Sequence, residues 1–148
     1  SSSSRGLGDV YKRQDENHPN CVGPSKRPFH TIIPGFVSED GCPRMAFGVM
    51  GGHMQHQGHV QMVKRVFEFG QNPQAAIDAP RWHVYPDFTI GLESGFDQSI
   101  ASQLVDLGHS VRFEKNESVF GGAQLILRSE NGFVAGSDSR KEGLAAGY

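Results

Sequence analysis

Residues 45–69 read MAFGVMGGHMQHQGHVQMVKRVFEF, an apolar run that stops at a pair of glycines and then changes its periodicity. The run before Gly51-Gly52 is rich in residues that favour β-strands, and the glycines permit a sharp change of direction. After them, apolar residues recur at helical spacing, which predicts a helix from about Met54 to Phe69. Its predicted docking stripe consists of Val60, Val63, Val66 and Phe67. The centre of the predicted fold is therefore a strand that turns directly into a helix.

A second strand is predicted on the N-terminal side of this unit. Phe29 to Val37 and Arg44 to Met50 are both β-rich runs, and Asp40-Gly41 between them is typical of a hairpin turn. With these bounds the loop covers residues 38–43 and is longer than the tightest hairpin type. Both runs are largely apolar with little alternation, which predicts strands that are buried on both faces.

Shorter elements are predicted in the rest of the chain. Asn72-Pro73 is typical of a helix start, and Pro80 ends this helix. Asn131-Gly132 is a strong turn signal for a second hairpin. The predicted elements are a helix to about residue 79, strands at 82–85 and 89–92, an amphipathic helix at 97–107 with Ile100, Leu104 and Leu107 on one face, a strand at 110–114, and hairpin strands at 122–128 and 133–136. This order predicts an α+β fold in which helices pack on the face of a sheet.

Charge and composition exclude several classes of function. The formal net charge of the 148 residues is −2, so no basic excess favours nucleic acid or an anionic membrane surface. No apolar run is long enough to cross a bilayer. Neither a nucleic acid nor a membrane is therefore expected as a partner. Two cysteines, Cys21 and Cys42, are too few for a disulfide scaffold and are interpreted as free thiols.

The first residues differ in character from the rest. Residues 1–15 are polar and Ser-rich without hydrophobic periodicity, which is typical of a disordered tail. Residues 4–14, SRGLGDVYKRQ, also resemble the translation of a transposon adapter used in sequencing-library preparation, which implies a reading frame truncated on its 5′ side. A natural linker or an expression scar is the alternative. In each case residues 1–15 are excluded from the fold, and residues 16–148 are treated as the domain.

Six segments of the remaining chain resemble the small subunit of the γ-glutamyltransferases, also called γ-glutamyltranspeptidases. They are residues 27–34 (RPFHTIIP), 48–61 (GVMGGHMQHQGHVQ), 72–81 (NPQAAIDAPR), 120–124 (FGGAQ), 136–141 (GSDSRK) and 145–148 (AAGY). One segment alone is a weak signal, but the order and spacing of all six cover nearly the whole of residues 16–148. The chain is therefore identified as the C-terminal part of that small subunit.

The resemblance implies a fold and an activity. Members of the family are N-terminal-nucleophile hydrolases, so residues 16–148 are expected to form part of an αββα sandwich, in which two stacked sheets lie between layers of helices. A member is made as one chain that cleaves itself and exposes a threonine, whose hydroxyl is the nucleophile and whose amine is the base. The enzyme takes an acyl group from a γ-glutamyl amide such as glutathione and passes it to water or an amino acid.

The nucleophile itself is not expected among these residues. In the family it begins the small subunit, upstream of all six segments, and neither Thr31 nor Thr89, the two threonines present, lies in the processing context. The resemblance therefore implies a fragment that is inactive alone and needs the N-terminal large-subunit part of the same precursor. No cofactor is implied. The source is expected to be bacterial, and the compartment is either cytoplasmic, or periplasmic or secreted.

Gly51 and Gly52 match the Gly-Gly pair whose backbone N–H groups form the family's oxyanion hole. Physical chemistry supports this role, because a strand end that meets a helix start presents free N–H donors and glycine permits close approach. The alternative is that the two glycines only form a tight strand-to-helix turn.

His30 and Thr31 fall where family members carry a Ser-Ser pair that holds the α-carboxylate of the glutamyl donor. His30 can still donate a hydrogen bond to a carboxylate, and Thr31 retains a hydroxyl, so both are candidate substrate-binding residues. The substituted pair nevertheless departs from the family pattern and puts glutathione specificity in doubt. The alternative is that both residues simply lie along a packed strand.

Three histidines, His53, His56 and His59, lie three residues apart and are candidate metal ligands. At about 100° per residue, His53 and His59 lie roughly 120° apart around a helix, so the three do not converge. No metal site is therefore predicted, and His59 is interpreted as a hydrogen-bonded structural histidine. Asp138 and Arg140 match a family Asp-Pro-Arg run and are predicted to pin the final loop through ion pairs.

Two other functions remain open from the sequence. One is an amidase of the same fold that acts on a non-glutamyl acyl group such as a β-lactam side chain, and the substituted pair His30-Thr31 keeps it open. The other is a non-catalytic binding module that reuses half of the fold, in which Gly51-Gly52 need not face a cleft. For the γ-glutamyltransferase and for the amidase alike, the expected substrate is a small-molecule amide.

Overall fold

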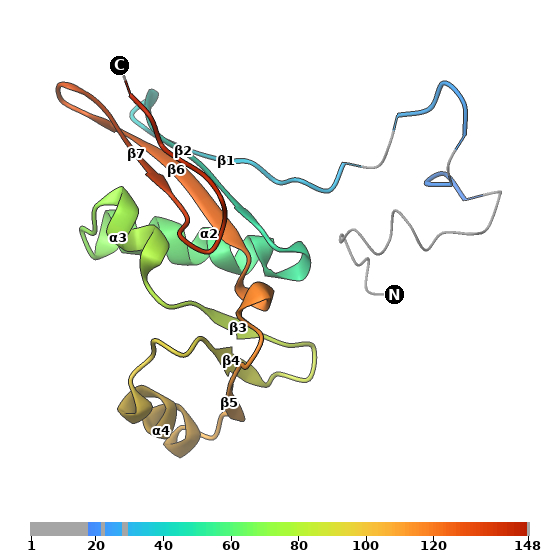
Figure 1. Cartoon of the computed structure of the whole chain (residues 1–148), viewed down its shortest axis with the longest axis vertical. Coiled ribbons are helices and arrows are strands. Elements are labelled where there is room, and N and C mark those ends of the chain that lie inside the picture. The colour runs from blue at the N-terminus through green and yellow to red at the C-terminus, as the bar shows by residue number, and fades with distance from the viewer. Residues whose placement is uncertain (1–17, 22, 28–29, 148) are drawn as a thin grey trace.

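The computed structural model describes residues 18–21, 23–27 and 30–147. Its main sheet has four antiparallel strands in the order β1-β2-β6-β7. These strands are β1 (Gly35–Glu39), β2 (Cys42–Met50), β6 (Gly122–Ser129) and β7 (Gly132–Ser137). Two helices cross one face of this sheet, and a smaller sheet with a further helix lies beyond them (Figure 1).

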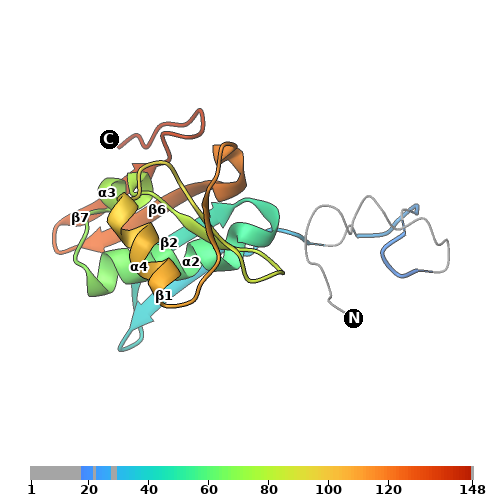
Figure 2. The same cartoon turned by 90° about the horizontal axis from the view of Figure 1, so that it is seen from below.

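The helix layer and the smaller sheet follow in chain order. Helix α2 (Gln55–Val63) begins with the 3-10 turn η1 (Gly52–Met54) and continues into the π-helical turn η2 (Lys64–Glu68), and α3 spans Pro73–Asp78. The smaller sheet pairs β3 (Trp82–Val84) antiparallel with β4 (Ile90–Leu92), and β4 parallel with β5 (Val111–Phe113). Helix α4 (Gln98–Asp106) joins β4 to β5 and lies in front of the other helices when the molecule is seen from below (Figure 2), and the 3-10 turn η3 (Glu117–Phe120) leads back to the main sheet. Among the described residues, no helix has the length and apolar character needed to span a membrane.

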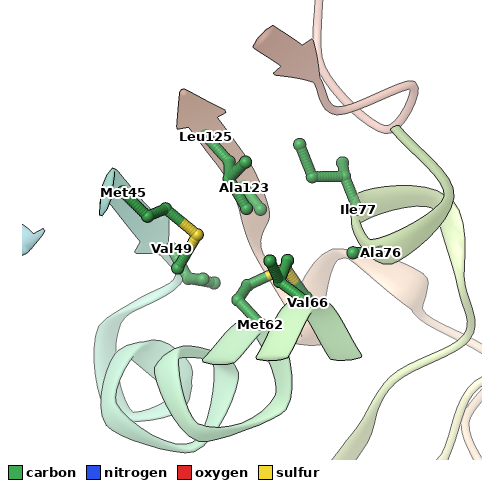
Figure 3. Close-up of a cluster of buried hydrophobic side chains, with 8 residues drawn as sticks. All are labelled: Met45, Val49, Met62, Val66, Ala76, Ile77, Ala123 and Leu125. Carbon is green, nitrogen blue, oxygen red and sulfur yellow. The ribbon is translucent and has the colours of Figure 1, made fainter. Parts of the chain in front are cut away.

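The hydrophobic core lies between the main sheet and the two helices on its face. Figure 3 shows side chains from β2 and β6 that point toward side chains from α2, η2 and α3. The buried cluster consists of Met45, Val49, Met62, Val66, Ala76, Ile77, Ala123 and Leu125. The strand-to-helix unit predicted from residues 45–69 is therefore present, and it supplies half of this cluster.

The prediction that the first two strands are buried on both faces is wrong. On the face away from the helices, Phe36 is 66% exposed, Met50 is 50% exposed and Ile126 on the neighbouring strand is 48% exposed. Side chains alternate across a strand, and within the described residues only one face of the sheet is covered by helices. An apolar run without alternation therefore has one row of side chains uncovered here.

The first hairpin also differs from the prediction. Strand β1 extends to Glu39 and β2 starts at Cys42, so the loop consists of Asp40 and Gly41 alone. Both loop residues have positive φ, 50° and 75°, which is the backbone geometry of the tightest hairpin type. At its other end β1 begins at Gly35, not at residue 29, because its pairing with β2 begins at that glycine; residue 29 itself lies outside the described residues.

The predicted docking stripe, which spans α2 and η2, is only partly correct. Val66 is buried as predicted, but Val60 is 51% exposed and Phe67 is 39% exposed, while Met62 is fully buried. Two polar residues, Gln61 and Arg65, are also buried, because the helix has partners on two sides. Its apolar side chains pack on the main sheet. Its buried polar side chains contact the loop and the strand that follow α3.

Several local signals are confirmed. Asn72 caps α3, since its side chain accepts a hydrogen bond from Ala75 N at 2.9 Å, and Pro73 is the first helical residue. The strands predicted between residues 82 and 114 are present, and β6 and β7 form the predicted hairpin. Helix α4 also forms, although none of its residues is buried.

Two glutamine side chains join α2 to the edge of the smaller sheet. Gln57 Nε2 donates to Val84 O at 2.9 Å, and its Oε1 accepts from Val84 N at 2.7 Å. One turn later Gln61 repeats the pattern with Trp82, at 2.9 and 3.1 Å. The side-chain amides thus act as a neighbouring strand would, because each satisfies both backbone groups of one β3 residue.

Replacing Gln61 with Met tests this junction. The substitution keeps the length of the side chain but leaves the backbone N–H and C=O of Trp82 without partners, so the free energy of unfolding should fall by about 1–3 kcal/mol. Equilibrium urea denaturation followed by circular dichroism measures the loss. The control is Gln103→Met on the exposed surface of α4, which should change stability by less than about 0.5 kcal/mol. Equal effects of the two substitutions would contradict the role of Gln61.

Candidate functional site

A cavity of about 410 Å³ lies where β2 ends and α2 begins. It brings together four parts of the chain, which are the segment before β1, the end of β2 with the glycine turn, the first residue of α2, and one residue of β6. Its lining consists of Thr31, Ile32, Ile33, Gly48, Val49, Met50, Gly51, Gly52, Gln55 and Gln124. The predicted site residues Gly51, Gly52 and Thr31 are thus found together at one cavity.

The glycine turn is shaped by close backbone contacts. A Cβ on Gly51 would lie 3.0 Å from Gly121 Cα, and a Cβ on Gly121 would lie 1.8 Å from Met50 O. Both glycines have positive φ, 138° and 70°. Gly52, with φ 57°, has open space where its Cβ would be, and it begins the 3-10 turn, so helical geometry leaves its N–H without a partner carbonyl. The turn is therefore tight at Gly51 and open at Gly52.

Gln55 connects two walls of the cavity. Its Nε2 donates to Thr31 O at 3.0 Å and to Gly52 O at 3.3 Å. The segment before β1 is thereby held against the first turn of the helix. His30, the second predicted substrate-binding residue, is exposed and does not line this cavity. The structure thus places Thr31 beside the glycines and His30 outside the cavity wall.

His59 is a hydrogen-bonded histidine, as predicted. Its Nε2 accepts from Val49 N at 3.2 Å, and its ring packs on the ring of Phe47 with 4.8 Å between centroids. Burial lowers the pKa of His59 below its ordinary value, and the nearby His56 lowers it further. The neutral ring is the form that can accept this hydrogen bond.

A buried ion-pair network lies behind the site. Asp138 and Arg81 are both fully buried, and Arg81 Nη2 donates to Asp138 Oδ2 at 2.5 Å. The same oxygen accepts from Ala123 N at 2.6 Å, and Oδ1 accepts from Arg140 N at 2.9 Å and Arg140 Nη1 at 3.2 Å. Arg140 also forms a two-pronged pair with Glu93, at 2.6 and 2.7 Å. The prediction that Asp138 and Arg140 pin the final loop through ion pairs is confirmed.

Three arginines converge on the carboxyl end of α3. Arg65 donates to the carbonyls of Ala76, Ala79 and Pro80, Arg81 donates to Ile77 O at 2.9 Å, and Arg140 donates to the carbonyls of Ile77, Asp78 and Ala79. Cations are favourable at this end of a helix, because its last carbonyls lack helical partners and carry the negative pole of the dipole. Each guanidinium thereby compensates part of its own burial.

The environment of the network shifts its pKa values. Burial lowers the pKa of Arg65 to about 10, and neighbouring Arg81 and Arg140 lower it as well. Burial alone would raise the pKa of Asp138, but the hydrogen bonds from Ala123 N–H and Arg81 outweigh it and hold that pKa below its ordinary value. Asp138 is therefore ionised in the folded chain across the neutral range.

Sequence reasoning missed both glutamines of the cavity, and it missed Arg65, Arg81 and Glu93 in the network. Gln55 and Gln124 lie within segments that carry the family resemblance, yet nothing in their spacing indicated that they line the cavity. Glu93 lies outside those segments, and its pairing with Arg140 joins residues far apart in sequence. Within the described residues, no group of three histidine, cysteine, aspartate or glutamate side chains is arranged to hold a metal ion.

The fold and the glycine turn define the class of protein. A cephalosporin acylase from Bacillus halodurans superimposes with a TM-score of 0.76 at 43% identity, over 90% of this chain and 25% of that one. The chain thus has part of the N-terminal-nucleophile hydrolase fold. The sequence model of the family Gamma-glutamyltranspeptidase matches residues 3–148, and the chain belongs to that family. The interpretation of residues 1–15 as an adapter-like or disordered tail lies outside the described residues and stays a prediction.

Two curated relatives show how much of a family member the chain represents. The glutathione hydrolase-like YwrD proenzyme of Bacillus subtilis is 36% identical over 140 residues, which are 90% of this chain and 27% of that protein. The glutathione hydrolase proenzyme of Escherichia coli is 33% identical over 151 residues, which are 99% of this chain and 25% of that protein. The chain therefore spans about a quarter of the length of these relatives.

Gly121→Ala tests the close contact behind the glycine turn. A methyl group there would meet Met50 O and strain a residue with positive φ, so we expect a loss of about 2–5 kcal/mol in the free energy of unfolding. Gly48→Ala is the matched control, because its Cβ would enter open space without positive φ. Urea denaturation of both variants measures the difference. A Gly121→Ala variant as stable as Gly48→Ala would show that the contact is not tight.

Asp138→Asn tests the buried network. The substitution leaves Arg81 buried without its counter-charge, so stability should fall by about 3–5 kcal/mol at neutral pH. The folded-state pKa of Asp138 is lowered, so its contribution is complete above the ordinary value of 3.8 and is lost as the pH falls through the lower folded value. Urea denaturation between pH 7 and 3 should therefore show the gap between wild type and variant closing only in strong acid. A gap that closes already near pH 6 would contradict the assignment.

Proposed function

We propose that this chain is the C-terminal part of an acyl-transfer enzyme that cleaves an amide through a threonine acyl-enzyme. Gly51 and Gly52 supply the oxyanion hole, with their backbone N–H groups directed at the carbonyl oxygen of the acyl group. The observation that carries the proposal is that both glycines line a cavity at a strand-to-helix junction, where N–H donors are free by geometry. Membership of the family supports the same assignment.

The nucleophile is supplied by a part of the protein outside residues 1–148. Thr31 lines the cavity, but it follows His30 in the chain, so its nitrogen belongs to a peptide bond and cannot act as a base. Thr89 does not line the cavity. A threonine at a newly formed N-terminus has both the hydroxyl and the free amine that the reaction needs. The large-subunit part of the same precursor is therefore the proposed partner, as the proenzyme names of the relatives support.

The proposed acyl donor is a γ-glutamyl amide such as glutathione, and the acceptor is water or an amino acid. Thr31 is the residue of this chain proposed to contact the donor, because it lies beside the glycines. His30 is exposed and outside the cavity wall, so it contacts the donor only if the missing part of the protein extends the site.

A second candidate is an amidase with a non-glutamyl acyl donor. Within the described residues, no side chain that lines the cavity is charged, whereas a γ-glutamyl group carries both an ammonium and a carboxylate. The 43% identity to a cephalosporin acylase supports this candidate as well. The two candidates share the oxyanion hole and the nucleophile and differ only in the acyl group.

Recovery of the complete reading frame tests the proposal. Sequencing upstream of residue 1 from the source DNA should reveal a continuous frame with a Thr-Thr or Thr-Ser processing site before residue 16. The protein from that frame should divide into two chains and release the amine from a chromogenic γ-glutamyl or acyl anilide. Replacing the threonine at the new N-terminus with alanine should abolish both processing and release. A start codon directly before residue 1 in a natural genomic context would overturn the enzyme assignment and favour the binding module.

A matched pair of substrates separates the two donors. γ-Glutamyl-p-nitroanilide carries both charges, and butyryl-p-nitroanilide presents an acyl chain of similar reach without either. A γ-glutamyl enzyme should show the larger kcat/KM with the first, because its charged groups then find partners in the missing part of the site. A larger kcat/KM with the second would decide for the amidase.

A further inference from the structure

We propose that His59 is a positioning residue that holds the end of β2, and with it the amide groups of Gly51 and Gly52, in the arrangement needed for reaction and releases them when its ring is protonated. This inference rests on the proposed oxyanion role of the two glycines. It assigns to His59 a part in the reaction that goes beyond its structural hydrogen bond.

Among the described residues, no strand pairs with the last residues of β2 on the side of β1. Pairing with β1 ends at the Gly35–Phe47 pair, so the last residues of β2 continue beyond it. On that side the N–H of Val49 donates to His59 Nε2 at 3.2 Å in place of a strand carbonyl. The His59 side chain therefore accepts a hydrogen bond of the kind that β1 carbonyls accept from the earlier residues of β2.

The hydrogen bond closes a short loop of chain around the glycine turn. Val49 and His59 lie ten residues apart, and Gly51 and Gly52 lie between them. Beside the bond, a Cβ on Gly58 would lie only 2.6 Å from Val49 Cγ1, so the helix backbone packs closely on the Val49 side chain. With strand and helix held at this point, the turn between them has little freedom to rotate its N–H groups away from the cavity.

The surroundings of His59 favour its neutral form. On β2 it faces the ring of Phe47 and the backbone of Val49, neither of which is charged. On its own helix the titratable neighbour is His56, whose electrostatic effect lowers the pKa of His59 further. The neutral ring keeps Nε2 free to accept the Val49 N–H, provided that the ring proton is on Nδ1.

Protonation would reverse this arrangement. A proton on Nε2 makes it a donor, so two donors would face one another and the hydrogen bond would be lost. Because the pKa of His59 lies below its ordinary value of 6.5, the bond is intact at neutral pH and is lost as the pH falls through the lowered value. Activity should therefore have an acid limb below pH 6.5 that follows His59.

Two substitutions separate positioning from packing. His59→Gln places a non-titrating oxygen the same number of bonds from the backbone as Nε2, so it preserves the acceptor. His59→Asn carries the same amide on a side chain one bond shorter, which cannot reach Val49 N. The protein from the complete reading frame is used, and kcat and KM are measured from pH 4.5 to 9 with the anilide substrate that it prefers.

His59→Gln should keep kcat at pH 8 within about 3-fold of wild type and lose the part of the acid limb that belongs to His59. His59→Asn should lower kcat about 3- to 10-fold at pH 8, as the loss of one hydrogen bond predicts, with KM changed less than about 2-fold. Wild-type kcat and acid limb in His59→Asn would overturn the proposal. An unchanged acid limb in His59→Gln would also overturn it, because another group would then be titrating.

A measurement that does not need activity accompanies the kinetics. The protection factor of the Val49 amide against hydrogen exchange should fall in wild type between pH 7 and 5, remain constant in His59→Gln, and be low throughout in His59→Asn. If no anilide is cleaved but this pattern is found, the proposed function fails and the coupling between His59 and the end of β2 stands. A Val49 amide equally protected in all three proteins would overturn the coupling itself.

Discussion

The fully buried pair of Arg81 and Asp138 joins four elements of the chain at one point. Burying two such ions costs several kcal/mol each, so the pair is stable only because nearly every lone pair and N–H around it is used. Asp138 accepts four hydrogen bonds, among them one from the backbone of Ala123 at the start of β6. Arg81 donates in turn to the carbonyls of Ile77 and Phe120. One ion pair thus joins the end of β7, the start of β6, the carboxyl end of α3 and the strand that begins the smaller sheet.

This junction connects the fold to the candidate site. Phe120 O is held by Arg81 and Ala123 N by Asp138, so the two glycines between them are fixed from both ends. Gly121 is one of these, and its backbone lies against Met50 and Gly51 in the glycine turn. The oxyanion donors of the proposed enzyme are therefore supported on one side by the ion pair. On the other side they are supported by the helix, through Gln55 and His59.

Features that depend on neighbouring residues could be predicted from the sequence, whereas contacts between residues far apart in sequence could not. The cap at Asn72, the proline after it and the Gly51-Gly52 turn each depend on neighbouring residues, so pattern and propensity were sufficient to place them. The extension of β1 and β2 toward the turn was missed because Asp40-Gly41 alone forms the loop, and flanking polar residues still pair across the strands. The candidate site followed from a family resemblance, since a Gly-Gly pair by itself indicates only a turn.

The polar residues of α2 and η2 show the limit most clearly. Gln61 and Arg65 are polar residues and so gave no sign of burial, yet both are buried because α2 has a second partner in β3 and the carboxyl end of α3. Apolar periodicity identifies the face toward the main sheet but says nothing about a polar face that pairs with backbone groups. Apolar periodicity also did not predict the exposed apolar face of the main sheet, which no helix within the described residues covers.

The most direct test of the oxyanion role proposed for Gly51 and Gly52 is a crystal structure of the acyl-enzyme. It uses the protein from the complete reading frame. A slow substrate or an acylating inhibitor would leave the acyl group on the nucleophilic threonine. We expect the acyl carbonyl oxygen to lie about 2.7–3.1 Å from the backbone nitrogens of Gly51 and Gly52. An acyl oxygen bound by other donors, with the cavity beside the glycine turn unoccupied, would contradict this role.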